Sequence, residues 1–299
     1  MRKSLGIHLT GTIASGVIEE QSPCGRVYHF PENSEEIDSP LLDTPLDGLI
    51  DLVKEQAVRA SRDCGPIDAV GLALPGIVRD GVVEDSPNLV QLKGVQIGER
   101  LRLALMEAGI TAPVAVLNDA DAVAAGLAAK RDRLGHFIRV WTLGWGIGFG
   151  RYPYAPGIWE GGHYVVTLDP GETYCGCGGR GHLEGVMGHR AMRLRFLDME
   201  PEEVFANAKS GDERCMKFVR LWHRSLAAAT ANSIHMEGPG RFYYTGFNVG
   251  FLDMKLLQHY LQQMVKMSPL QSYTLETIPM SDDLAVTGAA IAAAQNAGE

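Results

Sequence analysis

The stretch APVAVLNDADAVAAGLAAKR, residues 112–131, decides the class of the fold. Its first residues read as a short apolar strand, Asn118 and Asp119 follow as a turn, and an alanine-rich helix is predicted from about Ala120. A strand that runs directly into a helix is typical of α/β proteins. The same alternation continues in both directions along the chain, and we therefore expect an α/β fold.

The segments on either side supply the remaining elements. Two short strands around a Gly-Thr turn are predicted near the N-terminus, and a glycine-rich hairpin is predicted further on. Helices are predicted where apolar residues recur with a helical period. The predicted strands and hairpins lie at 4–20, 67–78, 137–152 and 241–250, and the predicted helices at 45–65, 98–109, 120–131 and 283–295. Residues 186–235 are mostly helical in pattern.

Composition excludes several classes of protein. The 299 residues carry a formal net charge of −9, which disfavours a nucleic-acid partner. No window approaches the length of apolar sequence that spans a bilayer, so we expect no membrane partner. Five cysteines do not suggest a disulfide framework, and the start of the chain does not resemble a signal peptide. We expect a cytoplasmic protein.

The Asn118-Asp119 turn is the first candidate site. A carboxylate at the end of an apolar strand lies where α/β proteins bind ligands. Asp119 could serve as a general base toward a hydroxyl group. Asp119 or Asp121 could equally cap the following helix. The spacing alone leaves both readings open.

The segment GETYCGCGGRGHLEG, residues 171–185, is the second candidate. A disulfide between Cys175 and Cys177 would be strained at this spacing. With His182 and the upstream His163, the two cysteines offer four ligands for tetrahedral zinc. The alternative is a glycine-rich loop with reduced thiols and surface histidines, and the residues by themselves do not decide between them.

The segment TLGWGIGFG, residues 142–150, is the third candidate. Its alternating glycines permit the close approach of a phosphate chain, and they permit a tight hairpin equally well.

Taken together, these motifs resemble the ROK family of sugar kinases and repressors. The resemblance covers nearly the whole chain, and the cysteine loop with the preceding EGGH is its most specific part. It implies a two-lobed actin-like (ribonuclease H-like) α/β fold, with a cleft between the lobes and a zinc loop at 163–184. The lobes would be 1–117, completed by the C-terminal helix 284–299, and 118–283. The matching motifs are LALPG (72–76), PNL (87–89), LNDADA (117–122), TLGWGIGFG (142–150), EGGH (160–163), CGCGGRGHLE (175–184) and TGAA (287–290).

The resemblance also implies roles for individual residues. Asp119 would be the base that takes a proton from a sugar hydroxyl, typically the 6-hydroxyl of a hexose. Structural zinc would be held by His163, Cys175, Cys177 and His182, with His182 in place of the family's last cysteine. The sugar-binding residues would be Gly76, Asn88, Asn118, Glu160, His163 and Glu184.

The nucleotide motifs depart from the family pattern. The family's D-x-G-G-T reads HLTGT here, with His8 for the aspartate and Thr10 for a glycine. Trp145 replaces the threonine of a G-T-G loop, and Phe247 follows Gly246 in the adenosine loop. Imidazole is a poor substitute for a carboxylate near hydrated Mg²⁺. The glycines and threonine that remain for a nucleotide are Gly11, Thr12, Gly144, Gly146 and Gly246.

Two classes of function follow. The first is a sugar kinase that uses Mg²⁺ and ATP, or another phosphoryl donor such as polyphosphate, to phosphorylate a hexose or N-acetylhexosamine. The second is a sugar-binding sensor of the same fold that transfers no phosphate. The resemblance further implies a homodimer.

Overall fold

A computed structural model describes residues 2–32, 41–62, 64–86, 88–154, 157 and 159–297. Pro87 of the PNL motif lies outside these residues. The chain divides into two compact units. Unit 1 comprises 1–137, 150–158 and 281–299, and unit 2 comprises 138–149 and 159–280. The sequence-based lobe boundary at 117/118 stays a prediction, and the packing groups the helix after residue 118 with unit 1.

The sheet of unit 1 has the strand order β3-β2-β1-β5-β8, with β4 paired to β2. β1 pairs with β2 antiparallel, whereas β1, β5 and β8 run parallel. The predicted N-terminal strand pair is therefore confirmed. The strands are β1 (Lys3–Leu9), β2 (Ile13–Glu19), β3 (Ser22–Pro23), β4 (Tyr28–Phe30), β5 (Ala69–Leu74) and β8 (Val114–Asn118), and a separate ribbon joins β6 (Ile77–Arg79) to β7 (Val82–Asp85).

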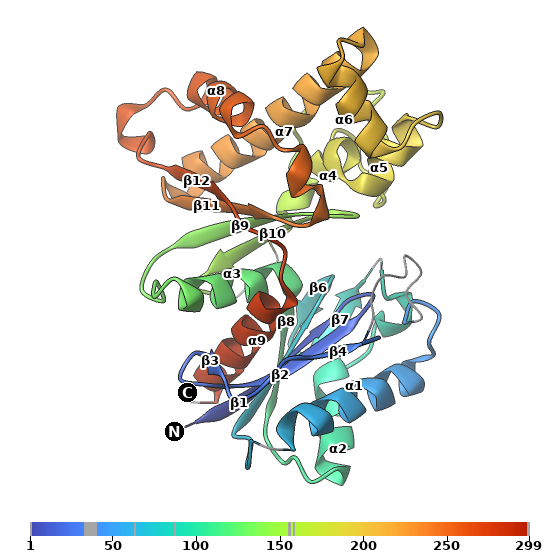
Figure 1. Ribbon diagram of the computed structural model, residues 1–299, viewed down its shortest axis with the longest axis vertical. Coiled ribbons are helices and arrows are strands. Elements are labelled where there is room, and N and C mark those ends of the chain that lie inside the picture. Colours follow the sequence, from blue (N-terminus) through green and yellow to red (C-terminus); the bar gives the residue numbers. More distant parts are fainter. Residues whose placement is uncertain are drawn as a thin grey trace. The chain divides into compact units, whose positions relative to one another are not determined.

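Helices cover both faces of this sheet (Figure 1). α1 (Leu46–Ser61) and α2 (Ile97–Glu107) bury their apolar residues against side chains such as Ile7 and Leu72. α3 (Asp119–Lys130) and α9 (Asp282–Asn296) cover the other face. α1 ends at Ser61 rather than near Gly65. Pro66 disfavours a helical conformation at the residue before it, which is Gly65, and Gly65 turns at φ +75°.

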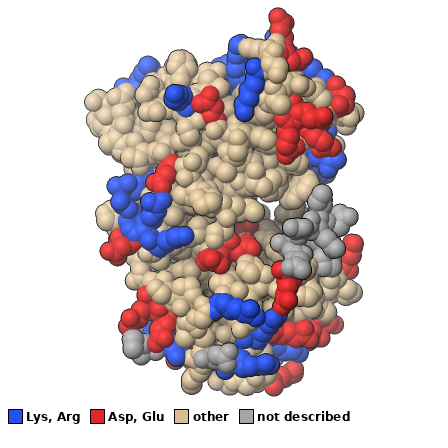
Figure 2. All heavy atoms as spheres, in the orientation of Figure 1, with Lys and Arg blue, Asp and Glu red and all other residues tan. Residues whose placement is uncertain are grey.

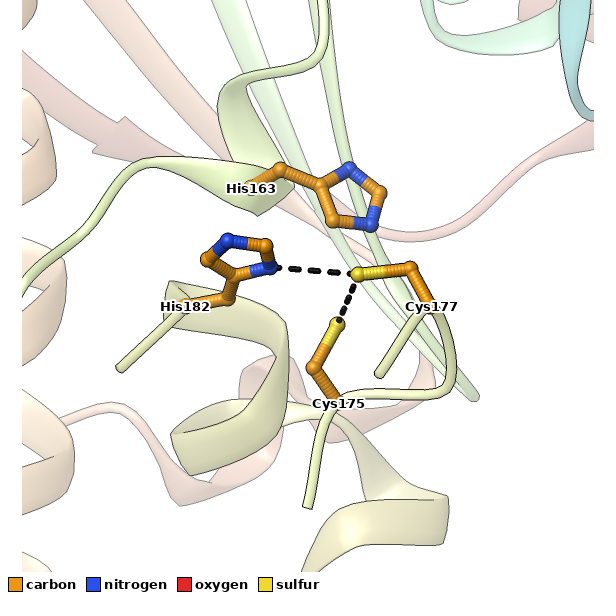
Figure 3. A group of neighbouring side chains, drawn as sticks. All are labelled: His163, Cys175, Cys177 and His182. Atoms are coloured by element: carbon orange, nitrogen blue, oxygen red, sulfur yellow. Dashed lines mark hydrogen bonds between the residues drawn. The ribbon is translucent and has the colours of Figure 1, made fainter. Parts of the chain in front are cut away.

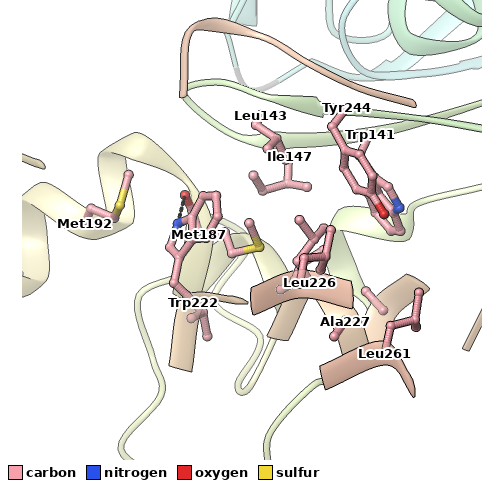
Figure 4. Close-up of a cluster of buried hydrophobic side chains, with 14 of the residues drawn as sticks. Trp141, Leu143, Ile147, Met187, Met192, Trp222, Leu226, Ala227, Tyr244 and Leu261 are labelled. Carbon is pink, nitrogen blue, oxygen red and sulfur yellow. Dashed lines mark hydrogen bonds between the residues drawn. The ribbon is translucent and has the colours of Figure 1, made fainter. Parts of the chain in front are cut away.

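The sheet of unit 2 has the order β10-β9-β11-β12, with β9, β11 and β12 parallel. The predicted glycine-rich hairpin is formed by β9 and β10. Aromatic residues of this sheet, among them Trp141 and Tyr244, belong to the same buried core as Trp222 and Leu226 (Figure 4). The elements are β9 (Ile138–Leu143), β10 (Ile147–Tyr152), β11 (Arg241–Thr245), β12 (Thr274–Thr277), α4 (Leu183–Met187), α5 (His189–Arg195), α6 (Pro201–Lys209), α7 (Glu213–Glu237) and α8 (Met254–Met264).

Short 3-10 turns complete the chain. They are η1 (Val90–Leu92), η2 (Gly161–His163), η3 (Phe247–Phe251) and η4 (Ser268–Leu270). Among the described residues, no helix combines the length and the apolar character needed to cross a bilayer. On the face drawn in Figure 2, acidic and basic side chains are interspersed.

Candidate functional site

Four predicted metal ligands meet in unit 2. The ligand atoms of His163, Cys175, Cys177 and His182 all lie within 4.8 Å of one another. The Cys177 sulfur lies 3.4 Å from the Cys175 sulfur and 3.3 Å from Nδ1 of His182. Figure 3 shows both sulfurs and both rings directed toward a common centre. We call these four residues the Cys-His cluster.

The glycines of the loop make this convergence sterically feasible. Gly178 and Gly181 have φ of +80° and +69°, which other residues rarely adopt. A Cβ on Gly179 would overlap the His182 ring, and a Cβ on Gly181 would overlap the carbonyl of Thr167. The loop is also pinned to the chain after His163, since Val166 N–H donates to the Gly181 carbonyl at 2.8 Å.

The cluster fits a tetrahedral zinc ion. Sulfur and nitrogen ligands at zinc-bond lengths lie roughly 3.3–3.8 Å apart around such an ion. The two measured separations fall in or close to that range. Two thiolates with two imidazoles are a donor set that structural zinc sites use. The residues present therefore fit the group that the sequence predicts.

The electrostatics of the cluster also favour a cation. Hydrogen bonds to Cys175 and Glu160 raise the pKa of His163 to about 11. Burial, and then the neighbouring His163, lower the pKa of His182. Zinc would take the place of the His163 proton, because imidazole binds a metal only in its neutral form.

Two carboxylates border the cluster. Glu160 Oε2 lies 3.3 Å from Nδ1 of His163. Histidines that bind a metal through one ring nitrogen commonly contact a carboxylate through the other. Glu184 Oε2 accepts a hydrogen bond from the Ile147 amide at 3.1 Å, and its Oε1 lies 3.7 Å from the Cys175 sulfur.

The Asn118-Asp119 turn lies in unit 1, at the end of β8. Asn118 is the N-cap of α3, where its Oδ1 accepts from the Ala120 amide at 2.9 Å. Its Nδ2 donates to the Gly76 carbonyl at 3.1 Å. Asp119 Oδ1 accepts from the same Ala120 amide, and Asp121 accepts from the Arg151 amide. The capping residue is thus Asn118, while Asp119 remains half-buried at the same corner.

The remaining predicted sugar-binding residue of unit 1 is Asn88, which lies exposed just before η1. Gly76 has φ +120°, and a Cβ there would overlap the Asp85 carbonyl, so this turn needs a glycine. Unit 1 therefore brings Gly76 and Asn118 into contact, with Asp119 beside them.

The HLTGT segment of unit 1, residues 8–12, is held by a side-chain contact that the sequence did not reveal. Nδ1 of His8 lies 3.1 Å from Asp282 Oδ1, and Nδ1 of His29 lies 3.6 Å from the other oxygen. The hydrogen bond from His8, with the charges of both histidines, lowers the pKa of Asp282. In the adjoining turn, the Thr10 amide donates to the Thr12 carbonyl at 2.8 Å.

In unit 2, the β9–β10 turn carries an aromatic group instead of a hydroxyl. The Trp145 ring lies 4.9 Å from that of His189 and 5.8 Å from that of Phe247, centre to centre. Trp145 and Phe247 are 48% and 45% exposed. Gly246 turns at φ +103°, and a Cβ there would overlap the Leu143 carbonyl.

Asn248 connects these loops, and sequence reasoning missed it. It is fully buried; its Nδ2 donates to the Gly144 carbonyl at 3.0 Å and its Oδ1 lies 3.1 Å from Nδ1 of His189. The only sequence signal is an asparagine close behind a strand and a glycine.

Comparisons with known proteins agree on one family. The family model described as "ROK family" matches residues 31–296. A glucokinase of Pyrobaculum calidifontis is 26% identical over 75% of this chain and 77% of its own length. A kanosamine kinase of Amycolatopsis mediterranei is 28% identical over 81% and 79%, respectively. An N-acetylmannosamine kinase of Haemophilus influenzae is 27% identical over 76% and 77%.

Solved structures agree on the fold. The ROK hexokinase of Thermus thermophilus superposes with a TM-score of 0.80 at 24% identity, covering 99% of both chains. A ROK glucokinase of Streptomyces griseus, in complex with glucose and AMPPNP, gives 0.71 at 21% identity over 98% and 99%. The predicted α/β, actin-like fold class is confirmed. Because the family model spans nearly the whole sequence, this chain belongs to the ROK family.

Proposed function

We propose that this protein is a sugar kinase that phosphorylates a hydroxyl, O6, of a hexose or an N-acetylhexosamine, with ATP as the donor and Asp119 as the general base. One observation carries the proposal. Asp119 is half-buried at the carboxyl end of a parallel strand, and its neighbour Asn118 is tied to the Gly76 turn. Ligands of open α/β sheets bind at this end of the strands.

The proposed step is a direct transfer. Asp119 accepts the proton of the sugar hydroxyl while the hydroxyl oxygen bonds to the γ-phosphorus. The bond from that phosphorus to the bridging oxygen breaks, and ADP leaves with the electron pair. Magnesium bound with ATP supplies charge neutralisation at the phosphates. Asn118 orients the corner by bonding both the Ala120 amide and the Gly76 carbonyl.

The substrate class rests on the relatives and on the donor set. The curated relatives are named for glucose, kanosamine and N-acetylmannosamine, which are a hexose and two hexosamines. Sugar hydroxyls need acceptors and donors at fixed positions, which amides, carboxylates and imidazoles provide. The proposed sugar-binding residues are Gly76, Asn88, Asn118, Glu160, His163 and Glu184.

We assign the Cys-His cluster to one structural zinc ion. Four protein ligands leave no coordination position for a catalytic water, so the metal would shape the loop and would not activate a reactant. The loop carries Glu184 in the first turn of α4, two positions after His182. Zinc binding contributes directly to folding in such loops.

A sugar-binding protein without transferase activity, or a kinase with a donor other than ATP, is the second candidate. The aromatic contact between Trp145 and Phe247 favours it, because bulky rings occupy loops where the resemblance implies phosphate and adenosine binding. His8, which replaces an aspartate of the family motif, is already paired with Asp282. The residues left for a nucleotide are Gly11, Thr12, Gly144, Gly146 and Gly246.

The base assignment is tested with Asp119→Asn. Asparagine keeps an oxygen that can accept from the Ala120 amide, so the fold is retained while the base is lost. We expect ADP release with sugar to fall about 10²–10⁴-fold, with sugar affinity little changed. Asp121→Asn, two residues away, is the matched control and should keep activity. Equal turnover in Asp119→Asn and the wild type would remove Asp119 from the role of base.

Separate calorimetric titrations distinguish the two candidates. We expect heat from a hexose and from Mg-ATP when each is added alone. Heat from the sugar together with none from Mg-ATP at millimolar concentration would contradict the ATP-dependent kinase and support the second candidate. A repeat with polyphosphate then tests the alternative donor.

A further inference from the structure

The turn between β9 and β10 is held by hydrogen bonds from α5 and η3. The Gly144 carbonyl accepts from the His189 amide and from Asn248 Nδ2, each at 3.0 Å. The Trp145 carbonyl accepts from the Arg190 amide at 3.4 Å. These contacts all act on the first half of the turn.

Glu184 holds the second half of the same turn. Its Oε2 accepts from the Ile147 amide at 3.1 Å. A Cβ on Gly146 would overlap that oxygen, so the backbone of the turn packs directly against the carboxylate. The hydrogen bond joins residues 37 positions apart, and a charged acceptor makes it stronger than a bond between neutral groups.

Glu184 is also tied to the Cys-His cluster. It follows His182, the N-cap residue of α4, by two positions. Its Oε1 lies 3.7 Å from the Cys175 sulfur, and a Cβ on Gly185 would lie 2.8 Å from the Cys175 amide nitrogen. Whatever fixes Cys175 and His182 therefore also fixes the first turn of α4 and the Glu184 carboxylate.

We propose that Glu184 is a positioning residue that makes the conformation of the Gly144–Ile147 turn depend on metal in the Cys-His cluster. The inference rests on the metal site proposed above. Metal binding supplies the free energy that orders the ligand loop. The ordered loop fixes the Glu184 carboxylate, and the carboxylate fixes the Ile147 amide through their hydrogen bond. The metal is thereby linked to the glycine turn of β9 and β10 as well as to the sugar-binding residues on its own loop.

Trp145 makes the turn observable. It is half-exposed at the tip of the turn and rests against His189 and Phe247. Movement of the turn changes the solvent exposure of the indole and hence its accessibility to an aqueous quencher. Trp159 is also exposed, whereas Trp141 and Trp222 are buried, so Trp159→Phe gives a background in which Trp145 dominates quenching.

The experiment compares metal-loaded and chelator-treated protein. Hydrogen exchange of the Ile147 amide is followed by NMR, and iodide quenching of Trp145 is followed in the Trp159→Phe background. We expect exchange in the wild type to become about fivefold faster on metal removal, because that is the effect of losing roughly one net hydrogen bond. Quenching of Trp145 should rise in parallel.

Variants at position 184 test the route. Glu184→Ala should exchange rapidly even when loaded and should respond little to metal removal. Glu184→Gln keeps an acceptor of the same length and should respond as the wild type does. Glu202→Ala, a surface glutamate of α6, is the matched control. If Glu184→Ala does not fold, Glu184→Asp shortens the reach and should accelerate exchange in the loaded protein.

Two results would overturn the inference. One is an unchanged Ile147 exchange rate in wild-type protein whose metal loss has been verified by elemental analysis. The other is a loaded Glu184→Ala or Glu184→Asp protein that exchanges as slowly as the wild type. A wild type that contains no metal would instead contradict the metal site itself, so the two failures are distinguishable.

Discussion

His8 is the residue whose meaning changes most between sequence and structure. In the sequence it replaces an aspartate of the family's phosphate-binding motif. In the structure its Nδ1 is bonded to Asp282, and that carboxylate also faces His29. His8 thus joins β1 to the start of α9 through its contact with Asp282.

The His8–Asp282 pair predicts an acid-dependent stability. The pKa of Asp282 is lowered from its ordinary value of 3.8, chiefly by the hydrogen bond from His8. A carboxylate with a depressed folded-state pKa adds stability above the unfolded pKa and loses it as pH falls through the folded value. We therefore expect Asp282→Asn to flatten the acid limb of the free energy of unfolding.

Urea unfolding between about pH 6 and about pH 2 measures this limb. Asp282→Asn should be less stable than the wild type at the upper end and should converge with it at the lower end. Asp283→Asn changes the same net charge one residue away and serves as the control. An acid limb equally steep in Asp282→Asn and the wild type would show that the pair contributes nothing.

At the scale of elements, α9 explains the TGAA motif. A Cβ on Gly288 would overlap the Ala122 carbonyl of α3, and one on Gly126 of α3 would overlap the Leu284 carbonyl of α9. Gly6 of β1 and Gly71 of β5 have the same relation to the backbone of α9. Small residues therefore let the C-terminal helix lie directly on α3 and on the sheet.

This packing reverses the usual effect of a glycine-to-alanine change in a helix. Alanine normally stabilises a helix by roughly 0.5–1 kcal/mol. We expect Gly288→Ala to destabilise unit 1 by about 1–3 kcal/mol, the cost of overpacking. Gly48→Ala in α1 is the matched control, because its Cβ would meet only a side-chain methyl of Thr44, at 3.3 Å, and no backbone atom of another element. Thermal melts of both variants decide the matter, and a Gly288→Ala protein that is more stable than the wild type would contradict the packing argument.

For the whole molecule, metal removal should affect one unit only. All four residues of the Cys-His cluster belong to unit 2. We expect Cys177→Ser to lose the metal and to lower hydrogen-exchange protection across unit 2, while unit 1 keeps its protection. Cys24→Ser, in unit 1, is the matched control and should retain the metal. Elemental analysis with exchange mass spectrometry measures both quantities, and a uniform loss of protection over both units would contradict local ordering by metal.

Sequence patterns predicted many of the elements and singled out the four residues of the Cys-His cluster. The strand, turn and helix of 112–131 are correct except that the helix begins at Asp119 and is capped by Asn118. The four residues of the Cys-His cluster were identified from their spacing and from the family motif. Such signals depend on residues a few positions apart, where helix periodicity, turn chemistry and ligand spacing operate.

The partners of the site residues were decided by tertiary structure alone. His8 meets Asp282 across 274 positions, Asn248 reaches Gly144 across 104, and Glu184 reaches the Ile147 amide across 37. No local pattern encodes these contacts, because each arises only when separate strands and helices pack into a common core. The sequence by itself determined the fold class and singled out the four residues of the Cys-His cluster, whereas long-range packing decided which partners the site residues contact.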